Sequence, residues 1–274
     1  DKIPLKLAVF VKYELWLNYL QTLREKEVPT ILISARVNEK SAFLRSSLKH
    51  EYRKAFAGFD QIFVQDQLTL KLLQNFTKKD NLVRSGDTRY DRVLSNRQES
   101  EPIKGIQDFV GERLVIMGGS TWPMGEKLLL SAFDELKKSY SVCLIFAPHE
   151  IHPEKIEQQI TLRPGDGIRF SKIHEADENS AVLWLDNIGM LARLYAQADI
   201  AYVGGGWGSG LHNILEPAVF GCPVLFGPKT EKFPEAADMI AAGGAFQIHS
   251  LESLRDCLAK LLESPELRET IQRT

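Results

Sequence analysis

The chain has 274 residues, of which 44% are hydrophobic and 26% are charged, as in an ordinary globular protein of one or two domains. No run of residues reaches the ~18 apolar residues that span a bilayer. The three cysteines are odd in number and scattered, which favours reduced core residues over a disulfide or zinc framework. Residues 1–100 carry a net charge of +6 and residues 101–274 a net charge of −8, which indicates different partners for the two parts.

The first part of the chain alternates short apolar runs with amphipathic segments. Strands are expected at Leu7–Val11, Thr30–Ser34, Gln61–Val64 and Leu82–Ser85. Helical spacing is found at Leu15–Lys26, Lys40–Phe56 and Leu68–Phe76. This alternation predicts an α/β fold in which parallel strands are joined by helical crossovers.

A polar stretch with a proline, Ser95–Lys104, separates this part from a second α/β series. Residues 1–95 are therefore predicted to form one domain, 96–104 a linker, and 105–274 a second, doubly wound domain. Its strands are expected at Leu114–Met117, Val142–Ala147, Ile168–Phe170, Ala181–Leu185, Ile200–Val203, Val224–Phe226 and Ala245–Ile248. The first domain shows only about four strands and the chain lacks an initiator Met, so we expect a fragment whose first domain is incomplete.

The strongest motif is a glycine-rich loop that follows the strand expected at Ile200–Val203. Glycines occupy five of the seven positions from 204 to 210, and a helix is expected beyond them. Such a loop lets a ligand approach the backbone, and the helix N-terminus suits a phosphate. Ser209 is expected to cap the helix, and Glu216 to accept hydrogen bonds from a ribose diol. The alternative is a structural turn with a surface glutamate. The spacing is not G-x-G-x-x-G, which disfavours a redox enzyme.

Three further loops follow strands of the second domain, where parallel sheets bind ligands. Gly118–Glu126 contains Ser120 and opens a helix with Pro123. Ala147–Pro153 contains His149 and His152; a phosphate or sugar contact by His149 is preferred to a zinc site, because no third ligand has metal spacing. Asp186–Leu191 follows another strand and is predicted to lie against a nucleobase, with a plain turn as the alternative.

Charged residues of the first part form two groups. Lys12 and Glu14 follow the first strand and are expected to face an interdomain cleft, with an ordinary surface ion pair at a helix start as the alternative. Arg89 lies near the domain junction, where it suits a phosphate or carboxylate. A basic face is expected to meet lipid phosphates or a membrane surface, with a solvated face as the alternative. It comprises Arg36, Lys40, Arg45, Lys49 and Arg53.

Together these segments resemble the 3-deoxy-D-manno-octulosonic acid (Kdo) transferase family, which adds Kdo to the lipid A precursor. The resemblance follows the order of the chain through FVKYELWLNYL, SARVNEKSAF, SGDTRYDRV, GGSTWP, APHEI, DNIGMLARLYAQAD, GGGWGSGLHNILEPAVFGCPVLFGP and FPEAADMI. It implies a GT-B architecture, with two doubly wound, Rossmann-like domains facing a cleft. It also implies inverting transfer from CMP-Kdo without a metal or cofactor, in lipopolysaccharide biosynthesis. The expected location is the cytoplasmic face of the inner membrane, with no nucleic acid partner.

The resemblance also implies roles for individual residues. Glu14 matches a functional glutamate, and Arg89 matches a basic donor contact. Glu14 and Lys12 are expected to supply the acceptor side of the reaction. The predicted nucleotide-sugar contacts are Ser120, Pro148, His149, Ile188, Gly189, Met190, Gly206, Gly208, Ser209, Gly210, His212, Asn213 and Glu216. Met190 stands where the family commonly has Glu. The family's membrane anchor and its proposed catalytic glutamate, in a Gly-Glu motif, are expected upstream of Asp1, so no base is assigned in this chain.

Two other functions remain open on the sequence. One is a GT-B enzyme that uses a UDP-sugar, such as a lipid A disaccharide synthase or a UDP-sugar epimerase. The other is a nucleotide-binding fragment without turnover.

Overall fold

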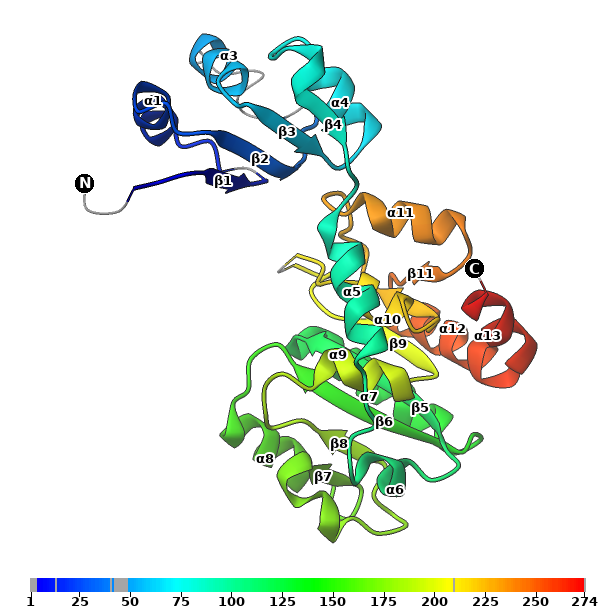
Figure 1. Ribbon diagram of the computed structural model, residues 1–274. Coiled ribbons are helices and arrows are strands. Elements are labelled where there is room, and N and C mark those ends of the chain that lie inside the picture. The colour runs from blue at the N-terminus through cyan, green and yellow to red at the C-terminus, as the bar shows by residue number, and fades with distance from the viewer. Residues whose placement is uncertain (1–3, 13, 40, 42–48, 209, 274) are drawn as a thin grey trace. The chain divides into compact units, whose positions relative to one another are not determined.

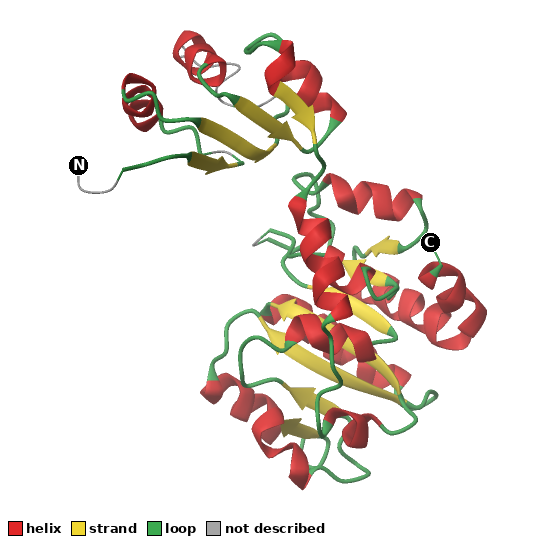
Figure 2. Cartoon of the chain, viewed as in Figure 1, coloured by secondary structure: helices red, strands yellow, loops and turns green. Residues whose placement is uncertain are grey.

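In the computed structural model, the described residues are 4–12, 14–39, 41, 49–208 and 210–273. They divide into two compact units, Asp1–Asp91 and Arg92–Thr274. Helices and strands alternate along both units (Figure 2), as the sequence predicts. No described helix is long and apolar enough to cross a membrane.

The first unit is a four-stranded parallel sheet in the order β1-β2-β3-β4. Its strands are β1 (Ala8–Val11), β2 (Thr30–Ala35), β3 (Gln61–Val64) and β4 (Leu82–Arg84). Its helices are α1 (Leu17–Glu25), α3 (Lys49–Ala57) and α4 (Gln67–Leu73), with a 3-10 turn, η1, at Lys79–Asn81. Side chains of all three helices pack into one core cluster with the strands, so they cover the same face of the sheet. Within the described residues, this sheet advances in one direction only.

The second unit has a seven-stranded parallel sheet in the order β11-β10-β9-β5-β6-β8-β7 (Figure 1). The strands are β5 (Leu114–Thr121), β6 (Val142–Pro148), β7 (Gly167–Arg169), β8 (Val182–Trp184), β9 (Ile200–Val203), β10 (Val224–Phe226) and β11 (Ala245–Gln247). All seven predicted strands are confirmed. From β5 the chain builds toward β7, and it then returns to the other side of β5 with β9. The sheet is therefore doubly wound, and its switch point lies between β5 and β9.

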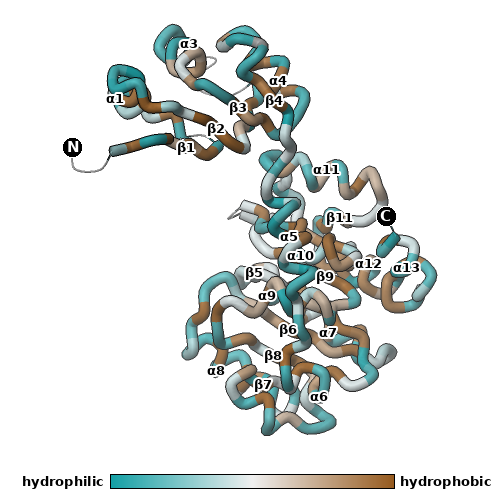
Figure 3. Tube along the Cα trace, viewed as in Figure 1, coloured by the Kyte–Doolittle hydropathy of each residue, from teal (hydrophilic) through white to brown (hydrophobic). Residues whose placement is uncertain are grey.

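Helices cover both faces of this sheet. They are α6 (Ile106–Val110), α7 (Pro123–Leu136), α8 (Pro153–Thr161), α9 (Leu191–Leu194), α10 (Leu215–Ala218), α11 (Pro234–Ala241), α12 (Leu251–Glu263) and α13 (Pro265–Gln272), with 3-10 turns η2 (Phe170–Glu175) and η3 (Tyr195–Gln197). Alternation along β5 splits its side chains between two clusters: Ile116 packs with α7, α8 and α12, and Val115 packs with α6 and α9. Because helices cover both faces of the sheet, its strands are hydrophobic along most of their length, as Figure 3 shows.

The boundary between the units differs from the predicted linker. Helix α5 (Thr88–Gln98) crosses the division and continues through the first residues of the stretch 96–104. Its sequence is polar because Val93 is its only buried residue. A solvated helix and a linker share this polar composition, so the sequence pattern alone predicts a linker here.

The cysteines lie where the sequence places them. Cys143 and Cys222 are buried and Cys257 is partly buried, and all three are free thiols. Burial raises the pKa of each thiol, to about 12 for Cys143 and Cys222 and to about 11 for Cys257. They are therefore unreactive core residues.

Candidate functional site

Four loops meet at the carboxyl edge of the second sheet. Because the strands are parallel, the loops after β9, β5, β6 and β8 follow one another along this edge in that order. The glycine-rich loop follows β9 and the Ser120 loop ends β5, so these two flank the switch point. The predicted donor-side residues thus lie along one edge of the sheet, and those of the loops after β9 and β5 flank the position where doubly wound sheets bind ligands.

The first glycines of the loop after β9 are required by contacts within the protein. A Cβ on Gly204 would lie 2.0 Å from the backbone oxygen of Ser120, and one on Gly206 would lie 2.7 Å from the backbone nitrogen of Gly227. The close approach is sealed by hydrogen bonds from the Gly204 N–H to the Gly119 oxygen (2.9 Å) and from the Lys229 N–H to the Gly206 oxygen (2.8 Å). Packing between loops therefore explains the glycine at 206, which the sequence analysis assigned to ligand approach.

The later glycines stand in open space. A Cβ on Gly208 or Gly210 would meet no atom of the protein within 4 Å. Gly210 has a φ of +95°, which other residues rarely adopt. These two positions are the part of the loop where a ligand has room to approach the backbone. Ser209, between them, lies outside the described residues.

The helix expected directly after the glycine loop starts later than predicted. The loop folds back through a hydrogen bond from the His212 N–H to the Gly204 oxygen (3.2 Å), and α10 begins only at Leu215. The Asn213 side-chain oxygen accepts from the Leu215 N–H (3.3 Å), where the prediction placed Ser209 as the cap. Glu216 is the second residue of this short helix and accepts a hydrogen bond from the Asn213 amide (3.0 Å).

Three aromatic rings form a cluster beside this loop. Trp122, from the loop after β5, stacks on His149 from the loop after β6, with ring centroids 4.7 Å apart. The His149 and His212 centroids are 4.4 Å apart, and the Trp122 indole N–H donates to Nε2 of His212 (3.0 Å). The structure therefore joins His149 and His212, both predicted site residues, through Trp122. Sequence analysis did not select Trp122, although a tryptophan in a strand-end loop is a detectable signal.

Two cavities lie on either side of Trp122. One, of about 290 Å³, is lined by Gly205 and Gly208 of the glycine loop. The other, of about 320 Å³, lies between α7 and α8 and is lined by Glu126, Pro148 and Lys155, among others. Burial raises the pKa of Glu126, while its bond from the Thr121 hydroxyl (2.9 Å) and the charge of Lys155 act in the opposite direction. Glu126 is a second residue of this edge that sequence analysis did not select.

The loop after β8 presents an apolar side chain to solvent. Ile188 is 91% exposed, which is unusual for an isoleucine, and Gly189 beside it has a φ of +90°. Met190 is partly buried against the core, and its sulfur accepts from the Asn187 amide (2.6 Å). Of the three predicted base contacts, Ile188 is therefore the one most available to a ligand.

A polar cluster occupies the carboxyl edge of the first unit. Arg89 holds Asp87 through two side-chain contacts, at 2.7 and 2.8 Å, and through its backbone N–H. Burial alone would raise the pKa of Asp87, but Arg89 and the charge of Lys12 together lower it. Lys12 has a φ of +59°, a strained conformation for a residue with a side chain. Exposed Glu14 accepts a hydrogen bond from the Trp16 indole N–H.

The predicted basic face is only partly visible. Lys40 and Arg45 lie outside the described residues. Lys49 is exposed at the start of α3, while Arg53 donates to the Asn75 backbone oxygen (2.7 Å) and lies over the Phe76 ring. Arg36 is on a different segment and faces Asp66 at 3.9 Å. Among the described members, Lys49 is thus the exposed residue whose side chain has no hydrogen bond or ion pair in the structure.

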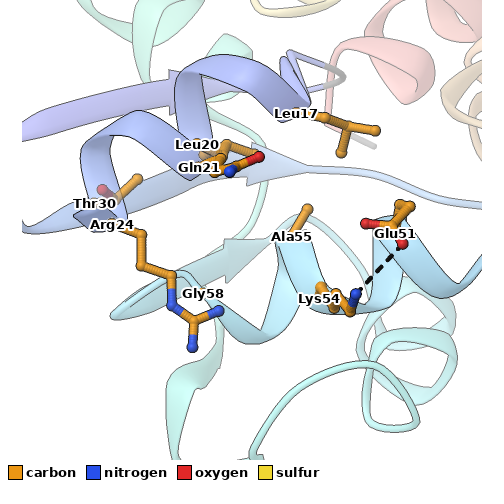
Figure 4. A pocket seen from close by; sticks show the side chains of 9 residues that line it. All are labelled: Leu17, Leu20, Gln21, Arg24, Thr30, Glu51, Lys54, Ala55 and Gly58. Atoms are coloured by element: carbon orange, nitrogen blue, oxygen red, sulfur yellow. Dashed lines mark hydrogen bonds and ion pairs between the residues drawn. The ribbon is translucent and has the colours of Figure 1, made fainter.

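One cavity of the first unit lies away from the carboxyl edge of its sheet. It has a volume of about 300 Å³ and lies between α1 and α3, where Lys54 contacts Glu51 (Figure 4). Thr30, which lines it, is the first residue of β2, so the cavity is at the opposite end of this strand from Lys12 and Arg89. It does not belong to the candidate site.

The two histidines with His-x-x-His spacing have separate partners. His149 belongs to the ring cluster, and the His152 ring contacts Glu150 (3.0 Å). Within the described residues, no group of three or more His, Cys, Asp or Glu side chains is placed to hold a metal ion.

Comparison with known proteins adds to this geometry. Residues 1–92 match the family described as 3-deoxy-D-manno-octulosonic-acid transferase (kdotransferase). Over 97% of its length, the chain is 27% identical to the 3-deoxy-D-manno-octulosonic acid transferase of Haemophilus influenzae, of which the match covers 64%. The chain is thus similar in sequence to Kdo transferases. Across eight curated relatives, seven of them Kdo transferases, it spans 40–64% of the relative's length.

Solved structures confirm the predicted fold class. The C-terminal CMP-Kdo binding domain of WaaA from Acinetobacter baumannii matches 67% of this chain and 94% of its own length, with a TM-score of 0.53 and 23% identity. The UDP-GlcNAc 2-epimerase of Neisseria meningitidis, bound to UDP-GlcNAc, matches 97% of the chain and 70% of itself, with a TM-score of 0.67 and 16% identity. The chain is therefore an α/β protein of GT-B type with Rossmann-like units.

Proposed function

We propose that the second unit binds CMP-Kdo at the carboxyl edge of its sheet, and that the protein transfers Kdo to a lipid A precursor. The observation that carries the proposal is that the open positions at Gly208 and Gly210, Glu216 and exposed Ile188 all lie along one carboxyl edge of a doubly wound sheet. These groups suit the three parts of a nucleotide: backbone N–H groups for phosphate, a carboxylate for ribose hydroxyls and an apolar surface for the base.

The reaction consistent with this site is attack by an acceptor hydroxyl on the anomeric carbon of Kdo, with CMP as the leaving group. Inversion requires the hydroxyl and the phosphate to stand on opposite faces of that carbon. The glycine loop and His212 lie on the leaving-group side, where dipoles and N–H donors stabilise the developing charge. Arg89, oriented by Asp87, is a cation at the carboxyl edge of the first unit, of the kind that binds carboxylates and phosphates. The transfer is proposed to need no metal.

The acceptor and the location follow from the same proposal. A lipid A precursor presents phosphates at a membrane surface, and Lys49 on α3 supplies an exposed positive charge for such a surface. Peripheral association with the cytoplasmic face of the inner membrane is therefore proposed, with no nucleic acid partner.

A second candidate is an enzyme that uses a UDP-sugar, which the fold similarity to UDP-GlcNAc 2-epimerase favours. The two differ in the base that the Ile188 loop accepts. A nucleotide-binding protein without turnover is distinguished from both by the absence of product.

The test is transfer of labelled Kdo from CMP-Kdo to a lipid A precursor, measured with the protein and with its Glu216→Ala variant. Transfer that depends on Glu216 supports the proposal. Turnover of UDP-GlcNAc in place of CMP-Kdo would assign the protein to the epimerase type. Binding without transfer, in a protein that also carries the upstream Gly-Glu motif that the resemblance implies, would leave it a nucleotide-binding protein.

A further inference from the structure

The bond between Trp122 and His212 restricts the protonation of the histidine. An indole N–H only donates a hydrogen bond, so Nε2 of His212 must accept with its lone pair. A neutral imidazole with an accepting Nε2 carries its proton on Nδ1, whereas an imidazolium has no accepting nitrogen. The 3.0 Å contact is therefore compatible with one form of His212, the neutral ring protonated on Nδ1.

The surroundings of the ring support the same form. The Cδ2 atom of His212 lies 3.1 Å from where a Cβ on Gly205 would be, so the Cδ2–Nε2 edge faces the glycine loop and Trp122. Nδ1 lies on the opposite edge, and no described residue forms a hydrogen bond with it. His149 is the titratable group that faces the ring within the described part of the chain. Burial, with a smaller contribution from His149, lowers the pKa of His212.

We propose that Trp122 is a positioning residue that fixes His212 as its Nδ1–H tautomer. His212, which follows the glycine loop, then offers an uncharged N–H donor to the anionic part of the ligand. The identity of that ligand, the phosphate or carboxylate of a nucleotide sugar, rests on the proposed function. An uncharged donor stabilises the anion less strongly than an imidazolium does. It therefore holds the departing nucleotide without the tight ion pair that would slow product release.

Nitrogen NMR tests the tautomer without reference to any ligand. Long-range ¹H–¹⁵N correlation spectra of the protein at pH 8 should show His212 with a protonated Nδ1 and an unprotonated Nε2. In Trp122→Phe, which keeps an aromatic ring for His149 to stack on, the spectrum should shift toward the Nε2–H form or a mixture. Wild-type protein with His212 protonated on Nε2 would overturn the proposal, and this result needs no variant to fold.

A double-variant comparison tests the consequence for binding. An asparagine at position 212 places its amide N–H group near the position of Nδ1 and has no tautomers. If Trp122→Phe lowers the competent tautomer to a fifth of the population, the Kd for CMP rises about fivefold. The same change in a His212→Asn background should leave the Kd within about twofold, because no tautomer remains to be selected. Equal weakening in both backgrounds would show that Trp122 acts only as a packing residue, and would overturn the proposal.

The two measurements separate this proposal from the proposed function. Absence of CMP binding by the wild-type protein, with His212 still in the Nδ1–H form, would reject the nucleotide and keep the tautomer assignment. CMP binding with the opposite tautomer would keep the proposed function and reject the role of Trp122.

Discussion

Replacing Glu216 with alanine tests the part of the site that contacts the sugar of the nucleotide. Glu216 is partly buried, and the Asn213 amide donates to its Oε1 at 3.0 Å, so one carboxylate oxygen is oriented within the protein and the other is left for a ligand. Hydrogen bonds to a charged group contribute ~1.5–3 kcal/mol. Loss of the carboxylate is therefore expected to raise the Kd for CMP by about 10- to 150-fold.

Isothermal titration of the wild-type and variant proteins with CMP measures this change directly. Glu216→Gln keeps an acceptor for Asn213 and for one hydroxyl, so its loss of affinity should be smaller than that of Glu216→Ala. Asn213→Ala removes the bond that orients Glu216 and should give an intermediate loss. Thermal unfolding of each variant checks that the fold persists. An unchanged Kd in a folded Glu216→Ala protein would refute the ribose-binding role.

Three further predictions concern stability and surface charge. Glu126→Gln keeps the acceptor for Thr121 and should raise the melting temperature at pH 7.5, because the pKa of Glu126 is raised in the folded state and the wild type therefore loses stability as pH rises from about 4.5 through that pKa. A lower melting temperature for the variant would contradict the burial argument. Gly204→Ala should lower the free energy of unfolding, measured in urea, by about 1–3 kcal/mol or more, because its Cβ would lie 2.0 Å from the Ser120 backbone oxygen. Gly208→Ala, whose Cβ would have no atom within 4 Å, should lower it by less than about 1 kcal/mol, and equal losses would refute the packing role of Gly204. Lys49→Glu should weaken cosedimentation with anionic vesicles but leave CMP binding unchanged. Lys138→Glu, at an exposed lysine of the second unit, changes the net charge by the same amount, and an equal loss of cosedimentation in this control would show that only net charge matters.

The strands were predictable because a buried parallel sheet leaves a simple pattern. Runs such as Ile200–Val203 and Gln61–Val64 are apolar, short and bounded by loop residues, and the structure confirms both with the predicted bounds. The loops that end these strands were identified for the same reason. Parallel order then brings them to one edge whatever their separation in sequence.

Features that depend on contacts between distant residues were not predictable. The polar composition of Ser95–Gln98 does not distinguish a solvated helix from a linker, and the structure continues α5 there. The start of α10 depends on the loop folding back from His212 to Gly204. Trp122 gains its role from a hydrogen bond to His212, which is distant in sequence. Glu126 gains its role from burial between helices. Neither contact leaves a pattern in the sequence. Gly206 was correctly marked as special, but its close neighbour is Gly227.

The central claim is that the second unit binds a cytidine nucleotide. Calorimetric titration of this chain with CMP and, separately, with UDP tests it most directly. The account predicts one CMP bound per chain, with an affinity at least about tenfold higher than that for UDP, a difference of about 1.4 kcal/mol. Tighter binding of UDP, or no binding of CMP by the folded chain, would contradict it.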